Sequence, residues 1–192
     1  MLKKLYDVTL SWAEHPHALW VLAIVSFVES SFFPIPPDIL MIPMILAKPS
    51  RAWLIASVAL IASVLGGLLG YAIGALAYEQ FGAPILESLG KAHAMEEFST
   101  RFNDLGFWAV LTAGITPFPY KVITIMSGWT GMPLATFIVT SIIARALRFY
   151  LVALLLWKFG APIRDFIEKR LPLMFTLFVV LLFAGFYVVR FL

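Results

Sequence analysis

Long uncharged apolar runs dominate the hydrophobic pattern of this chain, and closely spaced prolines break two of them. The first break reads Phe-Pro-Ile-Pro-Pro-Asp at residues 33–38, and the second reads Thr-Pro-Phe-Pro-Tyr-Lys at residues 116–121. The prolines of the two breaks are Pro34, Pro36, Pro37, Pro117 and Pro119. Proline removes a backbone donor and interrupts a helix, and freed backbone groups at membrane depth need partners from protein or a water-filled cavity. The pattern therefore predicts two broken helical hairpins around a polar site inside a membrane.

Three further runs are apolar without a break. Residues 52–78 and 133–157 are uncharged or nearly so, and at about 1.5 Å per residue each is long enough to cross a hydrocarbon core of about 30 Å. Residues 171–189 form a third run of this kind. The alternation that is typical of half-buried strands does not occur along the chain. We therefore expect an all-α integral membrane protein with three full spans in addition to the hairpins.

Charged segments separate these runs. Residues 79–104 contain seven charged side chains with apolar ones between them, which is typical of a connector that includes an amphipathic helix at a membrane face. Residues 3–14 have the same character and predict an interfacial helix. Residues 158–170 are expected to form a charged loop before the last span.

The order of these segments repeats along the chain. Pro34 and Pro117 lie 83 positions apart, and the spans that follow the breaks end in Phe-Gly pairs 78 positions apart. We predict a first repeat over residues 1–82, a second over residues 83–160 and a C-terminal transmembrane helix over residues 171–191, within one membrane domain of residues 1–192. Internal repeats are common in transporters, but two apolar helices can also resemble each other by chance.

The hairpins could be re-entrant or could cross the membrane, and charge does not decide between these. Either topology places eight Lys and Arg residues on the cytoplasmic side and three on the other. Re-entrant hairpins would make the two repeats inverted, so that the hairpins enter from opposite faces. We expect this arrangement because it sets Asp38 opposite Lys121.

Five ionisable residues fall inside the predicted membrane segments. They are Glu29, Asp38, Lys121, Arg145 and Arg148. Each charge costs roughly 2.5–3.5 kcal/mol on insertion scales unless it is paired, hydrated or bound to a ligand. Two acids against three bases leave one excess positive charge, which favours an anionic group, and guanidinium binds phosphate bidentately. Purely structural ion pairs that lock the hairpins are the alternative.

Small and polar residues form stripes along the two long central spans. Ser141, Arg145 and Arg148 share one helical face of the second span. The matching stripe of the first span consists of Ser63, Gly67, Gly70 and Gly74. Small residues at helical spacing let another backbone approach closely, so this face is expected to pack against a neighbouring segment.

Composition supports a membrane protein and excludes several functions. The chain is 61% hydrophobic and only 13% charged, whereas a soluble domain has about a quarter charged residues. Its net charge of +3 is scattered, which argues against nucleic-acid binding. Without cysteine it has neither disulfides nor thiolate metal sites, and we expect no metal or cofactor. No nucleophile and base have a recognisable spacing, so an enzyme is not expected.

The residues around the two breaks resemble those of a known family. Residues 27–38 (Phe-Val-Glu-Ser-Ser-Phe-Phe-Pro-Ile-Pro-Pro-Asp), residues 116–121 and the later Ser127-Gly128 look like the DedA family of SNARE-associated or VTT-domain membrane proteins, and like its YqaA-like branch in particular. The resemblance extends over roughly residues 25–160. It implies two re-entrant hairpins that face each other, a multi-pass protein of the bacterial inner membrane, and lipid flipping or scrambling, including undecaprenyl phosphate recycling by some members. Proton-dependent transport is also implied.

The resemblance assigns some of the charged residues and misses one. The family's membrane glutamate matches Glu29, and the aspartate after its first break matches Asp38. Two family arginines flank Phe-x-Pro in the second half, but here they correspond to about Gly114 and to Tyr120 or Lys121. One basic group is therefore absent, and we expect the two arginines of the next span to supply its charge.

Together these observations predict a lipid transporter, with membrane lipids as partners. Lys121, Arg145, Arg148 and Ser141 are expected to bind an anionic phospholipid or polyprenyl-phosphate headgroup. Glu29 and Asp38 are expected to pair with the bases at rest and to exchange protons during turnover. A proton-coupled small-solute or cation antiporter and a non-transporting scaffold stay open as alternatives, and so does a homo-oligomer.

Overall fold

The fold is known from a computed structural model that describes residues 17–32, 36–116 and 119–189, with side chains as far as residue 160 and at Pro162. All regular elements of these residues are helices, which agrees with the expected all-α class. Pro34 and Pro117 lie outside the described residues, as do residues 3–14, for which an interfacial helix was expected.

Two pairs of short helices flank the proline breaks. In the first half these are α2 (Ala18–Ser31) and α3 (Asp38–Ala47), and in the second half α7 (Gly106–Ile115) and α8 (Tyr120–Trp129). The longest has 14 residues, or about 21 Å of helix, which is less than the ~30 Å of a hydrocarbon core. The breaks therefore divide each apolar run into pieces that are too short to span a membrane alone.

Two helical stretches are long and apolar enough to cross a membrane within the part of the chain that was searched. The first, Pro49–Ser88, joins a short 3-10 turn η1 (Pro49–Arg51), α4 (Ala52–Ala77), a π-helical turn η2 (Tyr78–Gly82) and α5 (Ala83–Ser88). The second, Leu134–Gly160, is the first part of α9 (Leu134–Val189). The first two of the three expected spans are thus present as helices of sufficient length and hydrophobicity.

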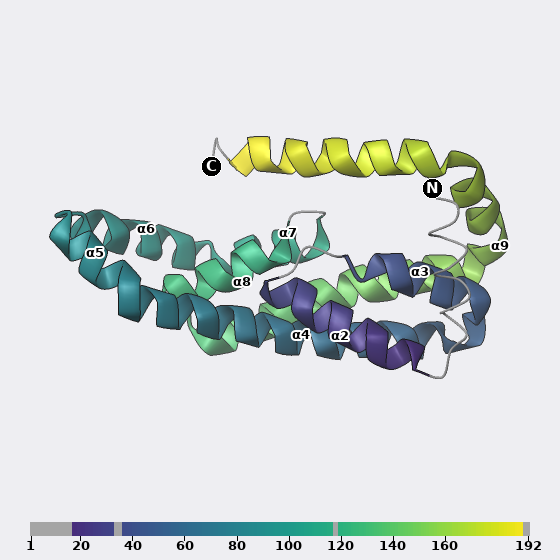
Figure 1. The fold of residues 1–192 in the computed structure, drawn as a ribbon, viewed down its shortest axis with the longest axis horizontal. Coiled ribbons are helices and arrows are strands. Elements are labelled where there is room, and N and C mark those ends of the chain that lie inside the picture. Colours follow the sequence, from purple (N-terminus) through teal and green to yellow (C-terminus); the bar gives the residue numbers. More distant parts are fainter. Residues whose placement is uncertain (1–16, 33–35, 117–118, 190–192) are drawn as a thin grey trace.

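The expectation of a loop at residues 158–170 is wrong, because α9 continues through these residues as a helix. Apart from Gly160 and Pro162, this segment consists largely of residues that tolerate a helix, such as Arg, Glu, Lys and Ile. In Figure 1 the ribbon of α9 turns where its colour passes from green to yellow, and the yellow part runs back along the molecule. Residues 171–189 are helical in this returning part, and their role as a membrane span stays a prediction.

The charged connector contains the expected amphipathic helix, α6 (Ala92–Asp104), whose side chains are mostly exposed. Its end is fastened to the turn between α8 and α9. The Asn103 amide donates to the Thr130 carbonyl at 2.9 Å, and the Thr130 hydroxyl donates back to the Asn103 side-chain oxygen at 3.1 Å. This reciprocal pair fixes the direction in which the chain enters α7.

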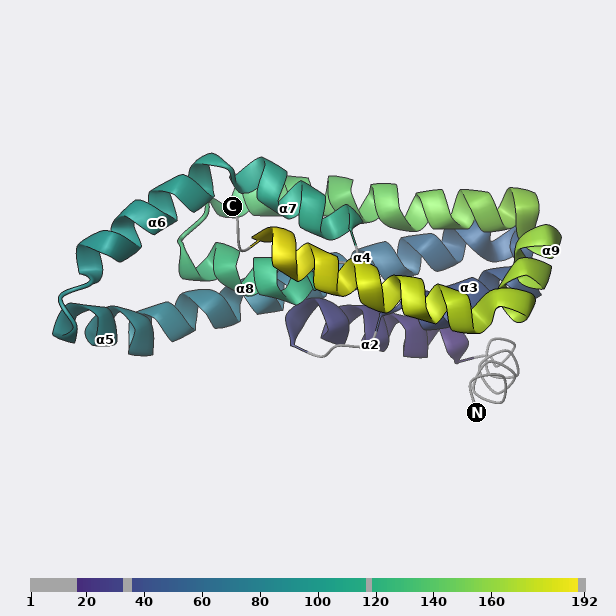
Figure 2. The same cartoon turned by 90° about the horizontal axis from the view of Figure 1, so that it is seen from above.

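The two helix pairs face each other along the long axis of the molecule. In Figures 1 and 2, α2 and α3 lie toward one end of the molecule, and α7 and α8 lie toward the other. The long helices α4 and α9 run beside both pairs. The Thr124 hydroxyl of α8 donates to the Ser30 carbonyl near the end of α2 at 3.0 Å, which shows that the two pairs touch.

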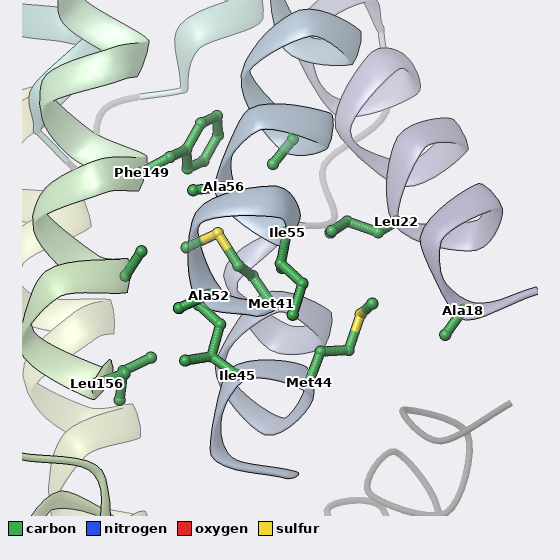
Figure 3. Close-up of a cluster of buried hydrophobic side chains, with 12 residues drawn as sticks. Ala18, Leu22, Met41, Met44, Ile45, Ala52, Ile55, Ala56, Phe149 and Leu156 are labelled. Atoms are coloured by element: carbon green, nitrogen blue, oxygen red, sulfur yellow. The ribbon is translucent and has the colours of Figure 1, made fainter. Parts of the chain in front are cut away.

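An apolar cluster holds the first helix pair against both long helices (Figure 3). Leu22 of α2, Met41 and Ile45 of α3, Ala56 of α4 and Phe149 of α9 are all buried in it. Small alanines on α4 alternate with larger side chains from the other three helices, so the helices interlock closely. This packing sets the position from which α3 and α9 direct their charged residues.

Glycines let α4 approach α2 and α8 at the level of their backbones. A Cβ at Gly66 would collide with the Phe27 carbonyl of α2, and one at Gly74 would collide with the Ile125 carbonyl of α8. Gly128 of α8 meets the Tyr71 carbonyl of α4 in the same way. The expected packing role of the small-residue stripe is confirmed, and α8 is the main partner of the stripe.

Candidate functional site

A buried polar cluster joins α2, α4, α8 and α9 around Ser30. The Ser30 hydroxyl lies 2.7 Å from the Ser63 hydroxyl and donates to the Glu29 carboxylate at 3.1 Å, while its carbonyl accepts from Thr124. Ser63 lies close to the middle of α4 (Ala52–Ala77), and Arg145 lies close to the middle of the apolar stretch Leu134–Gly160. The cluster is therefore about halfway along both membrane-length helices.

In the first acid–base pair of this cluster, protein encloses the arginine almost completely and leaves the acid slightly exposed. The Arg145 Nη2 atom donates to Glu29 Oε2 at 2.6 Å and to the Ser30 hydroxyl at 3.1 Å. The Arg145 guanidinium also lies 4.0 Å from the centre of the Tyr120 ring, a distance suited to a cation–π contact. With an exposed fraction of 2%, Arg145 is held from several sides.

Tyr120 orients this pair from the second break. Its ring lies over Arg145, and its hydroxyl donates to the Ser141 hydroxyl at 2.5 Å. Both Tyr120 and Ser141 are fully buried. Ser141 was expected to share one helical face with the two arginines. At Ser141 that face is covered by Tyr120 of α8.

The second pair connects the two breaks. Arg148 Nη2 donates to Asp38 Oδ2 at 2.7 Å, and Arg148 Nη1 donates to the Thr116 carbonyl at 2.9 Å. Asp38 is the first residue of α3, where the helix dipole favours an anion, and Thr116 caps the end of α7, where it favours a cation. One guanidinium thus satisfies a helix end from each hairpin.

Asp38 was expected to lie opposite Lys121 and to pair with one of the bases, and its ion-pair partner is Arg148. Lys121 is partly buried in the first turn of α8 and has neither an ion pair nor a side-chain hydrogen bond with the described residues. Only its backbone carbonyl is engaged, by the Thr124 hydroxyl at 2.9 Å. Since the other two bases are each paired with an acid, Lys121 is the one of the five predicted charges that has no ion pair within the described residues.

Several buried donors of the site have no partner among the described residues. These include the Nε atoms of both arginines, Arg145 and Arg148. A buried donor without a hydrogen bond is costly, yet neither Nε–H group has an acceptor among the described residues. Both Nε–H groups are therefore buried donors whose hydrogen bonds the described residues do not supply.

The break prolines that are described lie at helix starts. Pro36 and Pro37 come directly before α3, and Pro119 directly before α8. Proline suits the start of a helix, because the first N–H groups of a helix have no backbone acceptor and the missing N–H of proline is not needed there. The breaks consequently end in Asp38 and in Tyr120-Lys121, so that each new helix begins with a polar side chain at the site.

Sequence reasoning missed three members of the site. Ser30 carries no charge, Tyr120 had been noted only as part of the second motif, and Thr116 takes part through its backbone. The position of Ser30 beside Glu29 was a usable signal, because a hydroxyl next to a buried acid often bonds to it. A backbone carbonyl that receives an arginine from another helix leaves no trace in the sequence.

Metal binding finds no support at this site. Within the ranges that carry side chains, no three His, Asp or Glu residues lie close enough to hold an ion. Its chemistry instead rests on carboxylates, guanidinium groups, hydroxyls and one ammonium group, which together suit an anion with several oxygen atoms.

Comparison with known proteins identifies the family. A family model of the VTT domain matches residues 35–158, which include Asp38, both arginines and the second break. The chain belongs to the VTT-domain family, also known as the DedA or SNARE-associated family. No solved structure matches this VTT-domain protein. Family membership and the two apolar helices together indicate a membrane protein with a transporter-like role.

Relatives from two bacteria are similar to this VTT-domain protein over most of its length. An uncharacterized protein of Haemophilus influenzae is 41% identical over 168 residues, which is 85% of this chain and 87% of the relative. An uncharacterized protein of Histophilus somni has the same identity and coverage. These similarities support the family and assign no substrate.

Proposed function

We propose that this VTT-domain protein carries the phosphate-bearing headgroup of a lipid from one leaflet of the bacterial inner membrane to the other. The observation that carries the proposal is the pair of acid–base contacts, Glu29 with Arg145 and Asp38 with Arg148, near the middle of two membrane-length helices. Charges at this depth are expensive, so proteins retain them mainly for function.

The arrangement of the hairpins supports a transport path. Each helix beside a break is too short to cross alone, and the two pairs approach each other from opposite ends (Figure 2). In the proposed multi-pass topology they are re-entrant hairpins of two inverted repeats, and α4 and α9 are the spans that follow them. A polar site at the meeting point of two such hairpins is where transporters commonly place their substrate.

The charges favour an anionic headgroup. In the described site two acids neutralise two arginines, and the ammonium group of Lys121 is left over. A phosphate group matches this excess charge, and its oxygens fit the fork of a guanidinium. The acyl or prenyl chains stay in the surrounding lipid, since the outward faces of α4 and α9 carry exposed Ile and Leu side chains such as Ile61, Leu65, Leu147 and Leu151.

Reconstitution tests the proposal. Purified protein in liposomes should bring a fluorescent phosphatidic acid and a labelled polyprenyl phosphate to equal distribution between leaflets faster than empty vesicles do. Arg148→Ala and Asp38→Asn should slow this exchange by about tenfold or more, because each removes a charge from the path. Arg101→Ala is the matched control, since Arg101 pairs with Glu97 on the exposed face of α6. Wild-type protein that is no faster than empty vesicles would contradict the proposal.

The two acids inside the membrane also favour a second function, a proton-coupled antiporter for a small solute or cation. Glu29 and Asp38 have exposed side-chain fractions of 14% and 18%, so neither is fully sealed from water. A pH-gradient dye in the same vesicles separates the two functions. Collapse of the gradient by an added cation, with no lipid movement, would favour the antiporter. If neutralising the acids lowers stability and no transport occurs at all, the charges are those of a scaffold.

A further inference from the structure

The two arginines of α9 stand three residues apart, yet their surroundings differ. Arg145 has an exposed fraction of 2%, whereas Arg148 and its partner Asp38 have 19% and 18%. Arg145 is bound to Glu29, to Ser30 and to the face of Tyr120. An incoming ligand would have to dismantle all of these contacts to reach it, so Arg145 is fixed in place.

Arg148 has a binding edge that is only half used. The Nε and Nη2 atoms of an arginine form one edge that can hold two oxygens of the same anion. Asp38 is bound through one oxygen to Nη2, while the buried Nε has no partner among the described residues. A carboxylate bound to both Nε and Nη2 would satisfy this edge completely. Asp38 is bound to Nη2 alone and satisfies only half of it.

The opposite side of the same guanidinium is engaged by a weaker acceptor. Arg148 Nη1 donates to the Thr116 carbonyl at the end of α7, which is a neutral group. Only the donor of this hydrogen bond is ionised, whereas in the contact with Asp38 both partners carry a charge. A charged anion can therefore compete for Arg148 against both of its present partners.

We propose that Arg148 is an exchangeable latch between the two breaks, and that a phosphate group releases it by taking the Nε–Nη2 edge from Asp38. This inference rests on the proposed function and specifies which residue meets the headgroup first. Lys121, which has no ion pair with the described residues, is proposed to add a second positive charge from the first turn of α8. Asp38, once released, is stabilised by the N-terminal end of α3 and by water, since it is already partly exposed.

The latch couples ligand binding to a movement. Arg148 holds α3 of the first pair and α7 of the second pair at the same time, so its exchange removes a direct link between the hairpins. A ligand shifts a conformational equilibrium only by its difference in affinity for the two states. Phosphate has such a difference here, because it competes with Asp38 for the Nε–Nη2 edge that the contact with Asp38 occupies at Nη2.

Cross-linking across the breaks tests the latch. Ile39 follows Asp38 and Ile115 precedes Thr116, and both side chains are exposed. Because the chain has no cysteine, the variant I39C/I115C carries two unique thiols for a short bifunctional maleimide. In neutral detergent, dioctanoyl phosphatidic acid should lower the cross-linking yield about threefold or more. Dioctanoylglycerol, which has the same chains and no phosphate, should not change it.

A second cysteine pair serves as the matched control. Trp53 of α4 and Trp157 of α9 lie with ring centroids 6.2 Å apart, away from the breaks, so W53C/W157C should cross-link equally with and without phosphatidic acid. Arg148→Lys in the first pair keeps the charge and loses the two-atom edge, and its response to phosphatidic acid should be weaker. Asp38→Asn should lower the yield before any lipid is added.

The outcomes separate the latch from the proposed function. An unchanged yield in I39C/I115C, in protein that moves lipid in vesicles, would overturn the latch alone. A yield that falls with phosphatidic acid, in protein that moves no lipid, would support the latch and contradict the transport proposal. If inorganic phosphate lowers the yield as strongly as the lipid does, the exchange is supported and its ligand is the free phosphate ion.

Discussion

The guanidinium of Arg148 binds the Asp38 carboxylate at 2.7 Å and the Thr116 carbonyl at 2.9 Å, and so connects two residues that are 78 positions apart in the chain. Each of them lies at a helix end next to a proline break. The relationship explains why both breaks come to one place, because a single side chain satisfies an acid from one and an orphan carbonyl from the other. It also places an ion pair with about a fifth of its surface exposed where a ligand can compete for it.

Arg145→Ala should destabilise the protein strongly. The change leaves the Glu29 carboxylate buried without its partner, and breaking a buried pair in this way costs about 3–5 kcal/mol. The midpoint of thermal unfolding in detergent would measure the loss. The double variant Arg145→Met with Glu29→Gln should recover a large part of it, because neither charge is then left alone. A double variant as unstable as Arg145→Ala would show that the pair is not the reason.

Tyr120→Phe should separate the two roles of the tyrosine. The variant keeps the aromatic face over Arg145 and loses the hydrogen bond to Ser141, so we expect a loss of about 1 kcal/mol. Tyr120→Leu removes both contacts and should cost clearly more. Equal losses in the two variants, measured by thermal unfolding, would mean that the ring does not stabilise the arginine.

Gly74→Ala should disturb the contact between α4 and α8. Its Cβ would collide with the Ile125 carbonyl, and overpacking of this kind typically costs about 1–3 kcal/mol. Gly160→Ala is the control, because its Cβ would meet only a Leu46 methyl group at an ordinary distance of 3.6 Å. That substitution should be neutral or slightly stabilising, since alanine favours a helix over glycine. A loss in both variants would point to a general effect of adding a methyl group.

Asn103→Ala should loosen α6 without unfolding the rest. The side chain makes both hydrogen bonds that hold α6 to Thr130 in the turn before α9. We therefore expect faster hydrogen exchange across α6 and the start of α7, at a cost of about 1 kcal/mol or less, with α2 and α4 unchanged. Thr100→Ala is the matched control, because the Thr100 hydroxyl bonds only within α6. Unchanged exchange in α6 would show that its position does not depend on this pair.

Much of the architecture was predictable from local sequence. The long apolar runs of α4 and α9 predict helices of membrane length, because apolar length decides that property even with two arginines in α9. The closely spaced prolines predicted the breaks before α3 and α8, whereas the single prolines Pro43 and Pro162 lie inside helices. The glycines of α4 predicted a close helix partner in the same way. The helical course of residues 158–170 was missed, because charge was given more weight there than helix propensity.

The partners within the site depended on the tertiary structure. The five charged residues and their net charge were read from the sequence, which also placed Asp38 opposite Lys121. In the folded chain Asp38 is bound to Arg148. Which side chains meet depends on how α3, α8 and α9 are rotated about their axes, and that rotation is set by distant contacts such as those of Gly74 and Phe149. Composition and periodicity determined that the chain enters a membrane with buried charges, because those properties act residue by residue. Only packing between helices decided that Arg145 is buried and that Arg148 and Asp38 stay partly exposed, because burial depends on which helices surround a side chain.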